Sequence, residues 1–144
     1  MADFRKLDDT VTVAPQITIP DVAAIAAAGF RAIMNNRPDG EEPWQPGHET
    51  IAAEAARHGL AYHYVPVTNA TLGPDAVAAF GKVVDGAGGA VLAHCRSGTR
   101  CAILWAFDQA KRGDRPVDEI IGTAHEAGYD IENLRPALVH FAGG

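Results

Sequence analysis

Short β-branched, apolar runs alternate with longer alanine-rich runs along this sequence, and this alternation restricts the fold more than any other feature. The short runs predict strands at residues 10–13, 30–35, 60–67 and 90–94. The longer runs predict helices at residues 18–28, 48–58, 74–85, 99–112, 116–127 and 132–141. Strands that alternate with helices connect through right-handed crossovers. We therefore expect an α/β fold with a mostly parallel sheet of about four or five strands, flanked by helices.

The length and composition indicate one globular domain spanning residues 1–144, with 47% hydrophobic and 21% charged residues. The formal net charge of −6 argues against a nucleic-acid or anionic-membrane surface, because such surfaces are basic. The first nine residues lack the layout of a signal peptide, and no apolar run has membrane-spanning length. We expect a cytoplasmic protein with neither nucleic acid nor membrane as a partner.

The segment His94–Arg100, read as His-Cys-Arg-Ser-Gly-Thr-Arg, joins a predicted strand to a predicted helix. A loop in this place directs backbone N–H groups and the positive end of the helix toward Cys95. These dipoles and the charge of Arg100 stabilise a thiolate, so Cys95 is predicted to be a nucleophile near neutral pH. Loops at the carboxyl ends of parallel strands share one crevice, which places this loop beside those after Asn35 and Val67.

The two cysteines of the chain, Cys95 and Cys101, are predicted to be free thiols, because a chain of this length folds without a disulfide. Their spacing along one loop–helix junction also disfavours an unstrained bridge. Cys101 is interpreted as a small buried residue of the first helical turn. The alternative is a resolving thiol that accepts sulfur or traps an oxidised Cys95.

The His94–Arg100 segment resembles the active loop of the phosphatase-like domain of the beta-lactamase hydrolase-like proteins, the DUF442 family. The resemblance extends to Phe30–Glu42 and Tyr62–Val67 and covers nearly the whole chain. It implies a fold related to the dual-specificity phosphatases, a cysteine nucleophile, and a role in dephosphorylation or in persulfide sulfur transfer. It also implies that His94 hydrogen-bonds the loop and holds its shape. Relatives fused to persulfide dioxygenases imply an enzyme of that type as a partner.

Two departures from the related phosphatases favour sulfur chemistry. Four residues separate Cys95 from Arg100, where those enzymes have five, and the shorter length is that of rhodanese-type loops. The segment Thr68–Gly73 has no carboxylate where those enzymes carry a general acid, and a thiol leaving group needs none. We therefore predict a sulfurtransferase that forms a persulfide on Cys95. It would use thiosulfate or a small persulfide as donor and a thiol as acceptor, and Arg100 would stabilise the departing anion.

Two alternatives stay open. The first is a tyrosine- or dual-specificity-like phosphatase that forms a phosphocysteine on Cys95, with Arg100 binding the phosphate oxygens. Its general acid would be a carboxylate of the 37–47 loop, namely Asp39, Glu41 or Glu42. The second is a non-catalytic module that binds anions with the same loop.

The remaining loop positions complete the predicted site. Substrate anions would bind Arg96, Ser97, Gly98 and Thr99. Arg37 and Asp39 lie on a loop within reach of the pocket and are predicted to support the site, although Asp39-Gly40 also reads as a simple turn. The histidines lack metal-ligand spacing, and no glycine-rich nucleotide motif occurs, so neither a metal nor another cofactor is expected.

Overall fold

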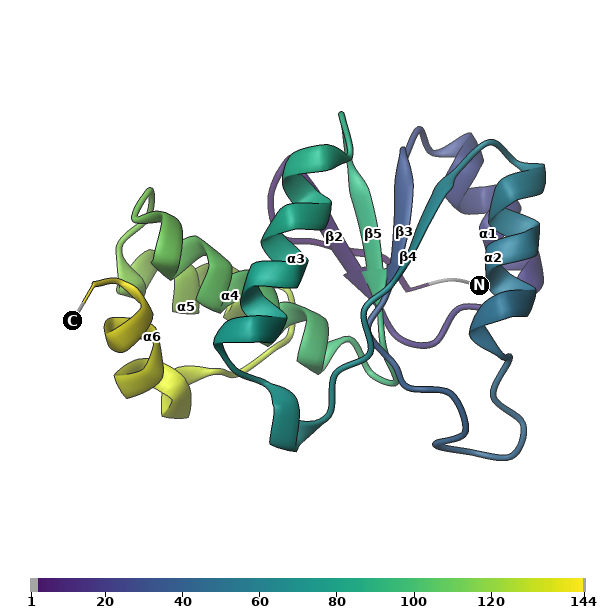
Figure 1. The fold of residues 1–144 in the computed structure, drawn as a ribbon. Coiled ribbons are helices and arrows are strands. Elements are labelled where there is room, and N and C mark those ends of the chain that lie inside the picture. Colours follow the sequence, from purple (N-terminus) through teal and green to yellow (C-terminus); the bar gives the residue numbers. More distant parts are fainter. Residues whose placement is uncertain (1–2, 144) are drawn as a thin grey trace.

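The computed structural model describes residues 3–143, whose strands form one five-stranded sheet in the order β1-β2-β5-β3-β4 (Figure 1). The strands are β1 Arg5–Lys6, β2 Val11–Ala14, β3 Ala32–Asn35, β4 Ala61–Tyr64 and β5 Val91–His94. Four of them pair in parallel, and β1 joins β2 in the antiparallel sense. The predicted α/β fold with a mostly parallel sheet is therefore confirmed.

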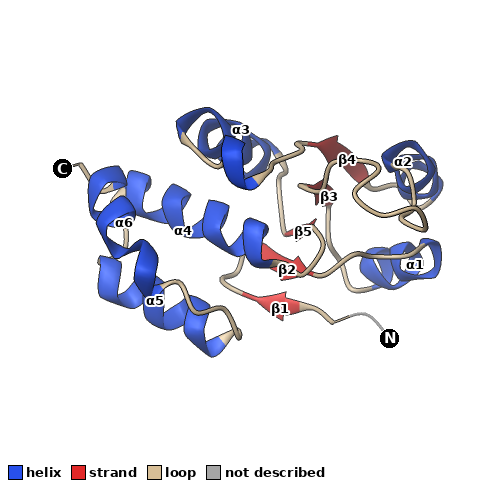
Figure 2. Ribbon diagram, turned by 90° about the horizontal axis from the view of Figure 1, so that it is seen from below, coloured by secondary structure: helices blue, strands red, loops and turns tan. Residues whose placement is uncertain are grey.

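The helices form a layer on each face of the sheet, as Figure 2 shows. The helices are α1 Ile19–Ala27, α2 His48–Arg57, α3 Pro74–Gly86, α4 Thr99–Arg112, α5 Val117–Glu126 and α6 Arg135–Phe141, with 3-10 turns η1 Asn69–Thr71 and η2 Glu132–Leu134. α1 and α2 cover one face, whereas α3 and α4 cover the other. α5 and α6 pack against the outer side of α4.

The central strands divide the apolar side chains between two cores, because successive residues of a strand point to opposite faces. Ile33 and Leu92 belong to the core beneath α1 and α2. Their neighbours Met34 and Ala93 belong to the larger core beneath the opposite helices. β3 and β5 are thus buried on both faces, which explains why their sequences are almost continuously apolar.

Three elements differ from the sequence predictions. β1 was not predicted, because two charged residues carry no apolar alternation. The strand predicted at 60–67 ends at Tyr64, although the N–H of Val65 still donates to Asn35 at the end of β3 and the N–H of Val67 to Asn36. The helix predicted at 132–141 is divided into η2 and α6, with Pro136 in the first turn of α6.

The carboxyl end of β5 lies between β2 and β3, and both neighbouring loops are bonded to it. The N–H of Asn36 donates to the carbonyl of His94 at 2.8 Å, and the N–H of Gln16 donates to the carbonyl of Arg96 at 3.1 Å. The chain that follows β5 is therefore held on both sides. Within residues 3–143, no helix combines the length and apolarity needed to cross a lipid bilayer.

Candidate active site

The loop between β5 and α4 encloses the Cys95 sulfur. Cys95 is the first residue after β5, and Gly98 caps the N-terminus of α4. The N–H of Gly98 donates to Cys95 Sγ at 3.1 Å. Gly98 has φ +93°, a conformation that side chains disfavour, and a Cβ there would lie 2.2 Å from the Tyr129 hydroxyl. Glycine is thus required both for the turn and for the close approach of Tyr129.

Cys95 is a thiolate at neutral pH, because its pKa is lowered to about 5. The largest cause is a hydrogen bond with the Cys101 thiol. Burial opposes this by raising the pKa, while the N–H groups of Cys101 and Gly98 and the charge of Arg100 lower it further. The dipoles expected from the sequence are present, but the strongest contribution comes from the second cysteine.

Cys101 is fully buried in the first turn of α4, and both cysteines are free thiols. Burial and the neighbouring Cys95 raise the pKa of Cys101 well above its ordinary value. The Cys101 thiol therefore keeps its proton and acts as a donor to Cys95. It is the small buried residue that the sequence predicted, and it also tunes the nucleophile.

Arg100 lies beside the loop and binds the carboxylate of Glu41. Its Nη1 donates to Glu41 Oε2 at 2.8 Å, and its Nη2 donates to Glu41 Oε1 at 2.9 Å. Nη1 also donates to the carbonyl of Val67 at 2.8 Å. Arg100 thus presents its planar fork to an oxyanion of the protein itself, in the bidentate geometry that suits a bound phosphate.

Arg37 is buried and anchors the loop that carries Glu41. Its Nε donates to Glu41 Oε1 at 2.9 Å, its Nη2 donates to Glu42 Oε1, and its Nη1 donates to Gln16 Oε1 at 3.1 Å. Arg100, and then Arg37, hold the pKa of Glu41 down to about 2. Arg37 was predicted to support the site. In the structure, Arg37 binds Glu41, and Glu41 in turn binds Arg100.

Asp39 faces α2 rather than the Cys95 loop. One carboxylate oxygen accepts from the N–H of His48 at 2.8 Å, and the other contacts His48 Nδ1 at 2.5 Å. Burial would raise the pKa of Asp39, but the hydrogen bonds with His48 outweigh it and leave the pKa below its ordinary value. Asp39 therefore sits in the turn that its Asp39-Gly40 sequence indicates, where it holds the start of α2.

His94 is buried, and burial lowers its pKa to about 4, so the ring is neutral at pH 7. The family resemblance implied that it hydrogen-bonds the loop. In the part of the chain that the structure describes, neither ring nitrogen has a partner within hydrogen-bond geometry, although an interaction with the Cys95 backbone opposes the lowering of the His94 pKa. Its backbone carbonyl, in contrast, accepts from Asn36 and ties the loops together.

A hollow of about 400 Å³, here called the anion pocket, is lined by Glu41, Thr68, Asn69, Arg96 and Arg100, whereas Cys95 is buried and is not among the described residues that line it. It draws on the loops after β3, β4 and β5, as the sequence predicted. Glu41 is the one carboxylate among the described residues that line it.

Ser97 and Thr99 are exposed on the loop, and the Ser97 hydroxyl donates to Thr99 Oγ1 at 2.9 Å. One contact to this loop was missed by sequence reasoning. The Tyr129 hydroxyl donates to the Ser97 carbonyl at 3.3 Å, from the segment that follows α5. The sequence around Tyr129 does not indicate this contact, because the contact with Ser97 forms only through the packing of α5.

Comparison with known proteins places this arrangement in a family. The model of the beta-lactamase hydrolase-like protein, phosphatase-like domain, matches residues 3–112. The chain belongs to this family. A beta-lactamase hydrolase-like protein of Xylella fastidiosa is 36% identical over 125 residues, which are 87% of this chain but 29% of that protein. The chain thus spans less than a third of the length of the curated relatives that it matches.

Solved structures agree with the family. A candidate phosphatase from Neisseria meningitidis has 39% identity and a TM-score of 0.85, over 95% of this chain and 96% of its own. The phosphatase PTPMT1 has a TM-score of 0.75 at 14% identity, over 96% of this chain and 93% of its own, and shows the shared fold. The domain therefore has a phosphatase-like fold.

These findings overturn the prediction of rhodanese-type sulfur transfer, since both the family and its structural neighbours are phosphatase-like. The length of the loop was a misleading criterion for the reaction. With four residues between Cys95 and Arg100, the Gly98 N–H still donates to the Cys95 sulfur, and Arg100 still lines the pocket. The absence of a carboxylate from Thr68–Gly73 was also a misleading criterion, because a carboxylate of a different loop, Glu41, lines the pocket.

Proposed function

We propose that this domain is a cysteine-dependent phosphatase that hydrolyses phosphate monoesters. The observation that carries the proposal is the Cys95 sulfur at the N-terminus of α4, which accepts the Gly98 N–H at 3.1 Å. The nearby charge of Arg100 helps to lower the pKa of this thiol. A thiolate with an adjacent anion-binding guanidinium suits attack on a phosphate ester. The phosphatase-like family and the Neisseria meningitidis structure support the same reaction.

In the first step, Cys95 Sγ attacks phosphorus, the S–P bond forms and the bond to the ester oxygen breaks. The leaving oxygen keeps the electron pair of that bond. The loop N–H groups and Arg100 hold the equatorial oxygens as charge develops on them. In the second step, water attacks phosphorus, the S–P bond breaks, and inorganic phosphate leaves with the Cys95 thiolate restored.

The protonation of the leaving group depends on Glu41. While Arg100 and Arg37 bind Glu41, it is ionised and has no proton to give. We therefore expect good leaving groups, such as phenolates, to depart as anions and to react faster than alkoxides. Movement of Arg100 onto a bound phosphate would remove the larger cause of the low pKa of Glu41 and raise that pKa, while Arg37 would still bind Oε1.

Hydrolysis of p-nitrophenyl phosphate tests the proposal. Wild-type protein should release nitrophenolate, and acid-quenched samples should carry one phosphate on Cys95 by mass spectrometry. Cys95→Ser should reduce kcat by more than roughly 10³-fold, and Arg100→Lys should reduce it by about 10²-fold or more. A folded wild-type protein with a reactive thiol, but with neither turnover nor phosphocysteine, would contradict the proposal.

A further inference from the structure

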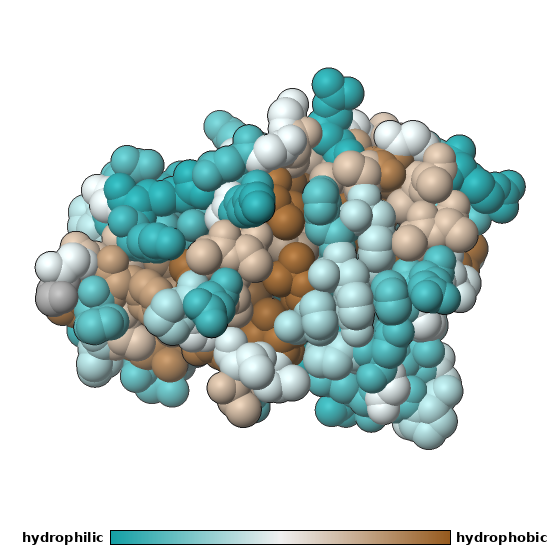
Figure 3. Space-filling view, in the orientation of Figure 1, coloured by the Kyte–Doolittle hydropathy of each residue, from teal (hydrophilic) through white to brown (hydrophobic). Residues whose placement is uncertain are grey.

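A second hollow, of about 640 Å³, lies beside the anion pocket, between the segment after β4 and the start of α3. Its walls are mostly apolar and include Val65, Pro66, Leu72, Pro74 and Ala76. Figure 3 shows apolar side chains gathered along the furrow between α3 and β4. Among the described residues that line this hollow, only Asp75 is charged.

The floor of this apolar hollow belongs to the hydrophobic core. Val65, Leu72 and Ala76 pack against the buried core but remain partly exposed. Burying such surface against an apolar ligand releases free energy in proportion to the area removed from water. The hollow is therefore suited to bind an apolar group.

The walls of the hollow are held in place before any ligand binds. Pro66 and Pro74 fix the backbone at its two ends. Between them, the N–H of Thr68 donates to Thr71 Oγ1 at 2.8 Å, which stabilises the turn η1. A pre-formed site loses little affinity to ordering on binding.

One segment borders both hollows. Thr68 and Asn69 line the anion pocket, whereas Ala70 and Thr71 line the apolar hollow. At the start of this segment, the carbonyl of Val67 accepts from Arg100 at 2.8 Å. A ligand held by Arg100 therefore has the apolar hollow next to it across this short segment.

We propose that the physiological substrate is a phosphate monoester with an apolar organic group, and that this group binds in the hollow lined by Val65, Leu72 and Ala76. The inference rests on the proposed phosphatase function. The two adjoining surfaces match the two ends of such a molecule, with Arg96 and Arg100 for the phosphate and an almost uncharged surface for the remainder.

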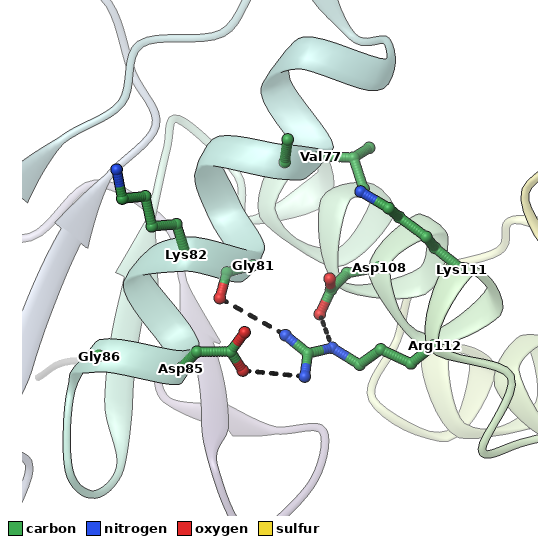
Figure 4. Close-up of a pocket in the computed structure, with 9 residues that line it drawn as sticks. Val77, Gly81, Lys82, Asp85, Gly86, Asp108, Lys111 and Arg112 are labelled. Carbon is green, nitrogen blue, oxygen red and sulfur yellow. Dashed lines mark hydrogen bonds and ion pairs between the residues drawn. The ribbon is translucent and has the colours of Figure 1, made fainter.

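A third hollow, between α3 and α4, does not compete for this role. Arg112 there binds Asp108 at 2.7 Å and Asp85 at 2.9 Å, as Figure 4 shows. Arg112 is thus already paired with carboxylates of the protein, although Lys82 and Lys111 also line this hollow. It also lies toward the C-terminal end of α4, whereas Cys95 lies at the opposite end of that helix.

The test measures the binding of n-alkyl phosphates from methyl to hexyl to the Cys95→Ser variant by calorimetry. Affinity should rise about two- to fourfold with each added CH2 group, because each methylene buried in the hollow adds favourable free energy of binding. Leu72→Asp should abolish this dependence on chain length and leave the affinity for methyl phosphate unchanged. Ala70→Asp, at an exposed position of the same wall, repeats the test without disturbing the core.

Two control variants locate the effect. Val139→Asp removes an exposed apolar side chain on α6 and should leave the dependence on chain length unchanged. Trp44→Ala removes the other large exposed apolar side chain of the described residues, on the loop that carries Glu41. Loss of the dependence in Trp44→Ala, with Leu72→Asp and Ala70→Asp unaffected, would overturn the assignment to this hollow.

The inference and the proposed function fail in different ways. Equal affinity for methyl and hexyl phosphate, with wild-type protein hydrolysing both, would overturn the inference and leave the phosphatase function intact. Affinity that rises with chain length and falls in Leu72→Asp, without hydrolysis by wild-type protein, would support the binding site and contradict the phosphatase function.

Discussion

Glu41 and Arg100 are joined by two hydrogen bonds, of 2.8 and 2.9 Å, across 59 positions of the sequence. The pair brings the loop after β3 onto the start of α4. The guanidinium that we propose to bind the substrate phosphate is thus engaged by a carboxylate of the protein. If a phosphate oxygen competes with Glu41 for Arg100, substrate binding and the protonation of Glu41 would be coupled.

Glu41→Gln should strengthen the inhibition of p-nitrophenyl phosphate hydrolysis by inorganic phosphate. The substitution removes a negative charge that neutralises Arg100, and one charge pair near 4 Å contributes about 1 kcal/mol in aqueous surroundings, or about fivefold in affinity. The inhibition constant should fall by that factor. Glu126→Gln, at the exposed end of α5, is the matched control and should change nothing. Weaker inhibition would show instead that Glu41 serves to orient Arg100.

The thiol of Cys95 should react with iodoacetamide at a rate that rises as pH increases through about 5 and is constant above about 7. The rate rises with pH because only the thiolate form of Cys95 reacts with iodoacetamide. Cys101→Ala removes the largest cause of the lowered pKa, so the midpoint should move upward, toward the ordinary value of a thiol. Cys101→Ser keeps a donor at this position and should preserve more of the effect. An unchanged midpoint in Cys101→Ala would assign the low pKa to the loop N–H groups and Arg100.

The sequence predicted the four parallel strands, the helices and the Cys95 loop because these depend on local patterns, whereas it missed β1. Apolar runs mark β3 and β5, and Gly98 with Arg100 marks the turn into α4. The contacts that complete the site are not local. Glu41 meets Arg100, and Tyr129 meets Ser97, only after the layers have packed.

The choice of reaction failed for the same physical reason. A carboxylate was sought in the segment Thr68–Gly73, which follows β4 in the sequence. Parallel strands bring several loops to one edge, so any of them can supply a side chain to the pocket. Here the carboxylate, Glu41, comes from the loop after β3, which the phosphatase alternative had named as its source. Its guanidinium partners are Arg37 on the same loop and Arg100 in the first turn of α4.

Gly98→Ala should destabilise the fold and impair the site more than the same substitution at Gly59. Both glycines have positive φ, +93° and +74°, so both variants lose roughly 1 kcal/mol of stability from backbone strain. At Gly59 a Cβ meets nothing within 4 Å, whereas at Gly98 it would lie 2.2 Å from the Tyr129 hydroxyl. Urea denaturation should show the larger loss for Gly98→Ala, and iodoacetamide titration should show a raised Cys95 pKa. Equal losses in the two variants would mean that Tyr129 moves freely.

His94 should make the fold sensitive to acid. Its pKa is about 4 in the folded protein against an ordinary value of 6.5, so the unfolded chain binds more protons between these values. Stability therefore falls as pH decreases from 6.5 toward 4, by roughly 3 kcal/mol from this residue. Cys95 also loses a stabilising charge on acidification, so the test compares wild type with His94→Gln in urea at pH 7 and pH 4.5. The variant is expected to lose about 2 to 3 kcal/mol less between the two conditions. Equal losses in both proteins would contradict a neutral, buried His94.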